Sequence, residues 1–152
     1  MLKDRGIFSY TSVELLLVII LIGVWVAVVL PRFNGGDLFK KAKLKTAAYN
    51  IVSDIRFVRN LAITNAKTYI IDFDFVQNEY RIYKESVAAE NQVEETRIIP
   101  EVVSCSGENQ LNFSSLGSVS FAADGVINLT SGRGQYRIMV IHATGSAYIE
   151  NL

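Results

Sequence analysis

One carboxylate stands at the edge of a long apolar run, where it is well placed for a specific charge interaction. Residues 15–31 carry no charged side chain, and Glu14 immediately precedes them. A helix rises about 1.5 Å per residue, so the run would cover roughly 26 Å, close to the roughly 30 Å hydrocarbon core of a bilayer. An acidic group at the end of a membrane helix is costly and is usually kept for a partner. The pattern therefore predicts a membrane helix whose acid interacts with another subunit.

Other interpretations of the apolar run differ in how well they fit its length. A cleaved secretory signal has a shorter apolar region of about 7–15 residues and then a small-residue cleavage site, whereas Leu30-Pro31-Arg32-Phe33 follows here. A buried core helix would be unusual without a polar face. An ordinary single-pass anchor fits the length equally well. Only three residues distinguish the assembly-helix interpretation from that of an ordinary anchor, namely Glu14, Gly23 and Pro31.

The spacing around Glu14 resembles the class III signal of type IV pilins and type II secretion pseudopilins. That signal is a short basic leader, a cleavage site, and an apolar helix with Glu as the fifth residue after the cut. The resemblance implies that residues 1–9 are a leader peptide and that cleavage falls between Ser9 and Tyr10. Residues 10–31 would then be the hydrophobic transmembrane and assembly helix, with Gly23 and Pro31 at offsets where the family often carries Gly and Pro.

The leader differs from the family pattern at two positions. The residue before the cut is usually Gly and here is Ser9, and the first mature residue is usually Phe and here is Tyr10. Cleavage after Gly6 instead would move Glu14 away from its expected offset. We therefore place the cut between Ser9 and Tyr10.

The resemblance also implies processing, partners and location. Prepilin peptidase would cleave the chain and methylate the new amine of Tyr10, and Glu14 would pair with that amine in a neighbouring subunit. The other implied partners are pseudopilins or pilins bound through the N-terminal helix, the inner-membrane assembly platform, and membrane lipid before assembly. The leader would lie in the bacterial cytoplasm and the head in the periplasm, although a count of basic residues near the span would place the N-terminus outside.

Bulk composition argues against several function classes. Fifteen basic and fifteen acidic side chains cancel in 152 residues, so the overall charge does not favour nucleic acid as a partner. Cys105 is the only cysteine, which excludes an internal disulfide and is typical of a small buried hydrophobe. No phosphate-binding loop, nucleophile elbow or Cys-x-x-Cys motif occurs. We expect no enzyme activity, catalytic residue, metal or cofactor.

We predict that residues 37–152 form a globular head, which begins with a helix over residues 38–65. Asp37 is a suitable N-cap, and we expect a bend or break between Pro31 and Gly36. Apolar residues recur at steps of three and four and form one stripe that should pack on a sheet, namely Leu44, Ala48, Ile51, Ile55, Val58 and Ala62.

After the helix the pattern is that of short strands. Residues 68–76 alternate in polarity, Gln77-Asn78 is a plausible hairpin turn, and 79–83 returns as a strand. Residues 85–96 read as a loop, and 97–105 as an edge strand interrupted by Pro100. Further strands are expected at 110–114, 118–122, 126–129, 135–142 and 147–150. We therefore predict an α+β, type IV pilin-like fold, in which a long N-terminal helix packs on one antiparallel sheet and buries Ile51, Ile55 and Val58 against Ile71 and Phe73.

A second resemblance covers the middle and end of the chain. Residues 47–72 resemble the GspH/FimT group of minor pseudopilins and minor pilins, with Asp54, Arg56, Arg59, Ala62 and Ile63 matching in order. The C-terminal strands also resemble that group. The resemblance implies a minor pseudopilin that supports type II protein secretion. The alternative is a minor pilin of a type IV pilus involved in assembly, adhesion or DNA uptake.

Four other features of the head suggest chemistry only weakly. His142 is the only histidine, so no histidine cluster can form. Two acids on one strand face, Asp72 and Asp74, suggest calcium but are more typical of a solvated face. Arg133 and Arg137 flank a glycine-rich turn and suggest phosphate contact. The lysines of 40–45 are more typical of a solvated turn facing lipid headgroups.

Overall fold

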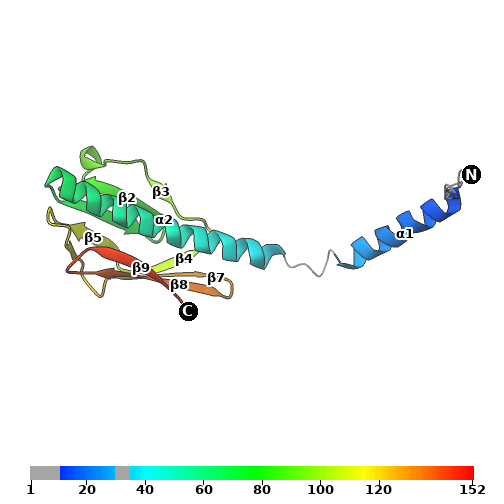
Figure 1. Cartoon of the computed structure of the whole chain (residues 1–152). Coiled ribbons are helices and arrows are strands. Elements are labelled where there is room, and N and C mark those ends of the chain that lie inside the picture. Colours follow the sequence, from blue (N-terminus) through cyan, green and yellow to red (C-terminus); the bar gives the residue numbers. More distant parts are fainter. Residues whose placement is uncertain (1–10, 30–34) are drawn as a thin grey trace, which may run out of the picture. The chain divides into compact units, whose positions relative to one another are not determined.

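The computed structural model of the chain describes residues 11–29 and 35–152. It divides into two compact units, Met1–Gly35 and Gly36–Leu152, which are described separately below (Figure 1). The predicted leader, residues 1–9, and the segment 30–34 lie outside the described residues. The predicted bend or break between Pro31 and Gly36 falls largely on that segment and stays a prediction.

The first unit contains one helix, α1 (Ser12–Val29). Every side chain from Thr11 to Ala27 is exposed, and the helix has no polar face. In the described parts of the chain, no helix is both long enough and apolar enough to cross a bilayer. The predicted membrane segment, residues 10–31, extends past both ends of α1 into residues that are not described, so it stays a prediction.

The helix α2 (Gly35–Asn65) starts earlier than predicted, and all of it except Gly35 belongs to the second unit. Gly35 and Gly36 are its first residues, and Asp37 lies in the first turn instead of at the N-cap. The predicted N-cap was therefore wrong. An acidic side chain in the first turn still interacts favourably with the positive end of the helix dipole. At the other end Ala66 adopts a φ of +50°, and Lys67 N–H donates to Ala62 O at 3.2 Å, as in a Schellman cap.

Two antiparallel sheets pack with α2, where one sheet was predicted (Figure 1). The five-stranded sheet has the order β3-β2-β1-β5-β6. Its strands are β1 (Tyr69–Asp74), β2 (Glu79–Lys84), β3 (Arg97–Ile98), β5 (Gln110–Phe113) and β6 (Val119–Ser120). The four-stranded sheet has the order β4-β7-β8-β9. Its strands are β4 (Ser104–Gly107), β7 (Val126–Ser131), β8 (Gly134–Ile141) and β9 (Ser146–Asn151).

The segment 97–105, predicted as one edge strand, is divided between the two sheets. Its first part is β3, which pairs with β2, and its last part enters β4, which pairs with β7. A turn in which Val103 N–H donates to Pro100 O at 2.8 Å separates them. Pro100 lacks an amide hydrogen and cannot continue a ladder, so the chain leaves one sheet here and joins the other. The other predicted strands and the 77–78 hairpin are confirmed, and the 85–96 loop also contains a short 3₁₀ turn, η2 (Ala89–Asn91).

One hydrophobic core joins the helix to both sheets. The predicted stripe of α2 is confirmed, because all its members are 2% exposed or less: Leu44, Ala48, Ile51, Ile55, Val58 and Ala62. Ile71 and Leu111 of the first sheet and Leu129 and Ile138 of the second lie in the same cluster of buried residues. Burial of about 25 cal/mol per Å² of apolar surface makes this cluster the main stabilising contribution to the head.

Replacing Ile55, which is fully buried, with alanine should destabilise the head strongly. The lost contacts and the cavity left behind predict a loss of about 2–5 kcal/mol in the free energy of unfolding. Ile63→Ala on the same helix is the matched control, because Ile63 is 43% exposed and should lose far less. Urea denaturation of the full chain in mild detergent, followed by circular dichroism, measures both. Equal losses for the two variants would contradict the placement of the core.

Candidate functional site

Glu14 lies in the first turn of α1, where Thr11 caps the helix. Glu14 N–H donates to the Thr11 backbone O at 3.0 Å and is 3.3 Å from Thr11 Oγ1, while Leu15 N–H donates to Thr11 O at 3.2 Å. A Thr three residues before a Glu is the spacing of a capping box. A negative charge in the first turn is also favoured by the helix dipole. Glu14 therefore helps to start α1 whatever else its carboxylate does.

The cap by Thr11 was missed by the sequence analysis, although the Thr-x-x-Glu spacing is visible in the sequence. The bond to Thr11 uses the backbone N–H of Glu14, so it leaves the side-chain carboxylate free to act elsewhere. That side chain is exposed, and it is the one charged group among residues 12–29. Within the described residues no hydrogen bond or ion pair uses this carboxylate. The helix thus carries one charge that is available to a partner.

From Leu15 to Ala27, α1 presents an apolar surface on all sides. Trp25 is 73% exposed, and it lines a shallow hollow together with Leu21, Ile22 and Val26. Nothing lies within 4 Å of the position that a Cβ on Gly23 would occupy, so another helix can approach closely there. An apolar surface of this extent marks a membrane or protein contact. The structure places Glu14 and Gly23 on one helix, while Ser9, Tyr10 and Pro31 lie outside the described residues.

In the head, the three polar residues of the Asp-x-Arg-x-x-Arg pattern fasten α2 to both sheets. Asp54 accepts a hydrogen bond from Tyr80 Oη on β2 at 2.6 Å. Arg56 Nη2 donates to the Ala147 backbone O on β9 at 3.2 Å, and Arg59 Nε donates to Gly117 O in the β5–β6 turn at 3.3 Å. Three of the five residues that carried the second resemblance therefore connect the helix to three different strands or turns.

Asp54 is also the centre of a small polar network. Arg97 Nε lies 3.7 Å from Asp54 Oδ2, and Arg97 Nη2 lies 3.5 Å from Glu94. Burial, and then the hydrogen bond to Asp54, raise the pKa of Tyr80 well above its usual range, so its hydroxyl remains a donor. This network was not predicted, because it depends on the pairing of α2 with β2 and β3. It links α2 to β2 and β3, although the buried Arg97 Nε makes no hydrogen bond within the described residues and contacts Asp54 only as an ion pair.

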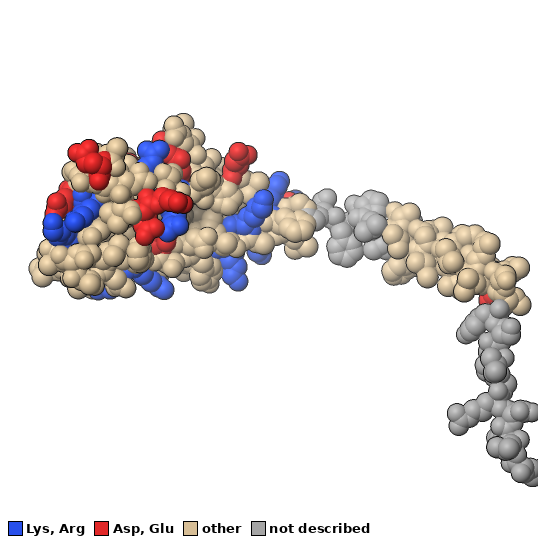
Figure 2. Space-filling model, turned by 90° about the horizontal axis from the view of Figure 1, so that it is seen from above, with Lys and Arg blue, Asp and Glu red and all other residues tan. Residues whose placement is uncertain are grey.

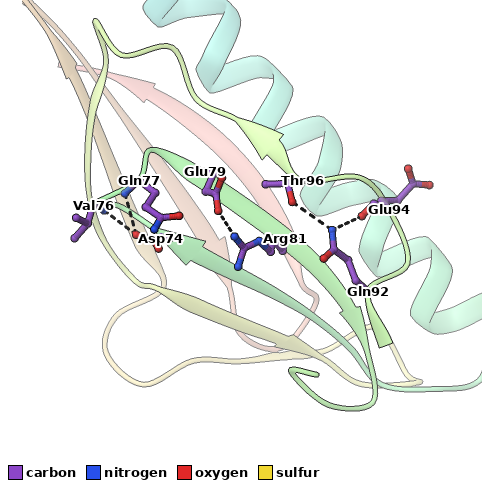
Figure 3. Close-up of polar contacts among 8 residues, drawn as sticks. All are labelled: Asp74, Val76, Gln77, Glu79, Arg81, Gln92, Glu94 and Thr96. Atoms are coloured by element: carbon purple, nitrogen blue, oxygen red, sulfur yellow. Dashed lines mark hydrogen bonds and ion pairs between the residues drawn. The ribbon is translucent and has the colours of Figure 1, made fainter. Parts of the chain in front are cut away.

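Of the two strand acids considered for calcium, Asp74 has a structural role in the hairpin. Asp74 Oδ1 accepts hydrogen bonds from Val76 N–H and Gln77 N–H at 3.0 Å each, which closes the β1–β2 hairpin (Figure 3). Asp72 lies opposite Arg81 in the register, and burial raises its pKa. Across residues 11–29 and 35–152, no group of three or more His, Cys, Asp or Glu side chains is arranged to hold a metal ion.

Polar side chains of β2 and of the loop that follows it form short-range contacts. Arg81 forms an ion pair with Glu79 on β2, and Gln92 Nε2 donates to Glu94 O at 2.8 Å (Figure 3). Thr96 Oγ1 lies 3.4 Å from the same Gln92 amide. The first of these contacts lies within β2, and the others lie within the connection between β2 and β3.

The remaining candidates are not brought together into one site. Arg137 pairs with Glu150 at 3.4 Å, whereas Arg133 lies in the β7–β8 turn beside the start of α2. His142 meets Phe121 edge-on, with ring centroids 5.6 Å apart. Burial raises the pKa of the Cys105 thiol to about 11, so it is a poor nucleophile at neutral pH.

Comparison with known proteins identifies the fold. No family model and no curated protein sequence matches the chain. Among solved structures, it is similar to the minor pseudopilin EpsH from the Type 2 Secretion System of Vibrio cholerae. The TM-score is 0.53 at 12% sequence identity, and the match covers 72% of this chain and 96% of that one. The chain therefore has a pilin-like α+β fold, with a long helix packed on antiparallel sheets, which confirms the predicted fold class.

Removing the Asp54 carboxylate should weaken the attachment of α2 to the first sheet. Asp54→Ala leaves the buried Tyr80 hydroxyl without its acceptor, so we expect a loss of about 1–3 kcal/mol in unfolding free energy. Adding Tyr80→Phe should restore part of that loss, since the orphaned hydroxyl is then gone. Asn60→Ala, at an exposed position of the same helix, is the control. Urea denaturation of the wild type, Asp54→Ala, Tyr80→Phe and the double variant gives the coupling energy, and strictly additive losses would show that the bond contributes nothing.

Proposed function

We propose that the chain is a minor pseudopilin, a structural subunit of a type II secretion pseudopilus that supports protein secretion. The observation that carries the proposal is the likeness of its fold to a minor pseudopilin. The apolar α1 with one carboxylate in its first turn supports it, because such a helix needs both a hydrophobic surrounding and a charge partner. On this proposal the chain is not an enzyme but the substrate of one.

Processing would prepare the helix for its two environments. Prepilin peptidase would cleave between Ser9 and Tyr10 and methylate the new amine of Tyr10. Residues 10–31 would hold the subunit in the inner membrane, with the leader in the cytoplasm and the head in the periplasm. The assembly platform would then move the subunit from lipid into the filament. The apolar surface of α1 supports both residence in the membrane and packing in the filament, because lipid tails and neighbouring apolar helices surround it with similar groups.

Within the filament Glu14 would set the register between subunits. An all-round apolar helix can slide along or rotate against its neighbours at little cost, whereas a buried charge tolerates only positions where it is paired. Leaving a buried ion pair without one partner costs about 3–5 kcal/mol. Pairing of the Glu14 carboxylate with the Tyr10 amine of the next subunit would therefore select one arrangement. The open space around Gly23 supports close helix approach in that arrangement.

Neutralising Glu14 should block entry into the filament without removing the subunit from the membrane. Glu14→Gln keeps the size of the side chain and the backbone bond to Thr11, so only the charge is lost. We expect at least tenfold less subunit in isolated pseudopili. A loss of about 1.4 kcal/mol already lowers an equilibrium constant tenfold, and losing one partner of a buried ion pair costs more than that. Ser12→Ala in the same turn is the matched control.

Quantitative immunoblotting of membrane and filament fractions measures this outcome in cells that make the other pseudopilins. Wild-type incorporation of the Glu14→Gln subunit would contradict the pairing. Recovery of the wild-type subunit in type IV pili, and not in pseudopili, would contradict the assignment to secretion and favour the minor-pilin alternative.

A further inference from the structure

The start of α2 extends beyond the core of the head and carries an unusual set of side chains. All of residues 36–43 are exposed, and Leu44 is the first buried residue of the helix. Leu38 is 67% exposed and Phe39 is 72% exposed, and basic residues follow them directly. Figure 2 shows Lys and Arg side chains gathered at this end of the head. The lysines of this stretch are Lys40, Lys41, Lys43 and Lys45.

The β7–β8 turn completes a hollow beside these lysines. Asp37, Lys40 and Lys41 of α2 and residues 131–134 of the turn line a space of about 160 Å³. Gly132, the first residue of the turn, has a φ of +58°, which suits a two-residue hairpin of type II′. A Cβ on Gly132 would lie 3.9 Å from Lys40 Cδ, so the lysine stem passes next to the turn. Arg133 thus lines the same hollow as the two lysines, although it is distant from them in the sequence.

The turn is held firmly in this position. Ser131 is buried, and its Oγ donates to Val102 O at 2.5 Å. At the other side of the turn, a Cβ on Gly134 would come within 2.9 Å of Leu44 Cδ2, so the backbone packs directly on the helix. Only glycine allows this approach without displacing Leu44. The backbone of the turn at Arg133 is therefore held next to α2 by the contacts of Ser131 and Gly134 on either side of it.

The hollow has an excess of positive charge. None of the ion pairs formed within residues 11–29 and 35–152 uses Lys40, Lys41 or Arg133. Asp37 is the one acid that lines the hollow, against three cations. Arginine and lysine side chains converging on one space are the donors that bind phosphate groups. The site thus fits a singly or doubly charged phosphate oxyanion.

The neighbouring apolar residues indicate that the phosphate belongs to a lipid. Exposed leucine and phenylalanine beside lysines are typical of a segment that lies in a membrane interface, where the apolar groups enter the headgroup boundary. Only five residues, 30–34, separate α1 from α2 in the sequence, and a segment of that length spans at most about 20 Å. On the proposed function, in which α1 lies in the inner membrane, this end of the head is within reach of its headgroups.

We propose that Lys40, Lys41 and Arg133 bind the phosphates of anionic phospholipids in the leaflet at the periplasmic end of α1. Leu38 would insert next to them, and Phe39 would insert from the other face of α2, where it lies near Lys43. The contact holds the head against the membrane before assembly and must break when the subunit enters the filament. It rests on the membrane anchoring in the proposed function. A basic residue near an anionic leaflet contributes about 1 kcal/mol, so two or three together give a measurable but reversible contact.

The test uses the full chain in nanodiscs of neutral phosphatidylcholine or of phosphatidylcholine with phosphatidylglycerol. Amide hydrogen exchange in residues 36–43 and 131–134 should slow by about fivefold or more in the anionic discs. The effect should shrink at high salt, because ions screen the attraction. Lys40→Gln with Arg133→Gln should abolish it. Lys67→Gln with Lys84→Gln removes the same charge beyond the other end of α2 and should leave it intact.

The outcomes separate this proposal from the one on which it rests. A chain that stays in the discs but exchanges equally in both lipids overturns lipid binding and leaves anchoring in place. Equal protection by inorganic phosphate in neutral discs overturns the lipid in favour of a soluble anion. A chain that separates from the discs on gel filtration overturns the anchoring and this proposal with it.

Discussion

The head depends on one constraint, which is that a single face of α2 must be buried by two separate sheets at once. Residues of the helix and of both sheets belong to one core cluster, and burial of that face supplies most of the stabilising free energy. Apolar packing alone tolerates small shifts of a helix along its axis. Asp54, Arg56 and Arg59 remove that freedom, because each bonds to a different strand or turn.

The elements that repeat with a clear period could be predicted from the sequence, and those defined by distant partners could not. The α2 stripe follows from the 3.6-residue period, and β1 and β2 from alternation and a turn. The division of 97–105 between two sheets depends on partners in β2 and β7, which the sequence does not specify. The two-residue strands β3 and β6 likewise exist only through their pairing. Buried Glu108, which accepts from Ala122 N–H and Ala123 N–H, is another contact that only the fold reveals.

The candidate site shows the same distinction. Glu14 and Gly23 could be located from their spacing within an apolar run, because an uninterrupted helix fixes the positions of its residues from sequence alone. The cap by Thr11 is equally local, since the Thr-x-x-Glu spacing predicts it from the sequence alone. The basic hollow was not predictable, since Arg133 reaches Lys40 and Lys41 only through the packing of Gly134 on Leu44. Local chemistry could be read from the sequence, whereas sites assembled from distant segments required the structure.

The central claim is that the chain is a prepilin-like substrate whose apolar helix becomes an assembly element after cleavage. Its most direct test is the intact mass and N-terminal sequence of the chain produced with and without prepilin peptidase. The account predicts loss of residues 1–9 and a new N-methylated Tyr10 only when the peptidase is present. An uncut chain, in cells where the same peptidase processes a control pilin, would contradict the account and leave an ordinary membrane-anchored domain as the better interpretation.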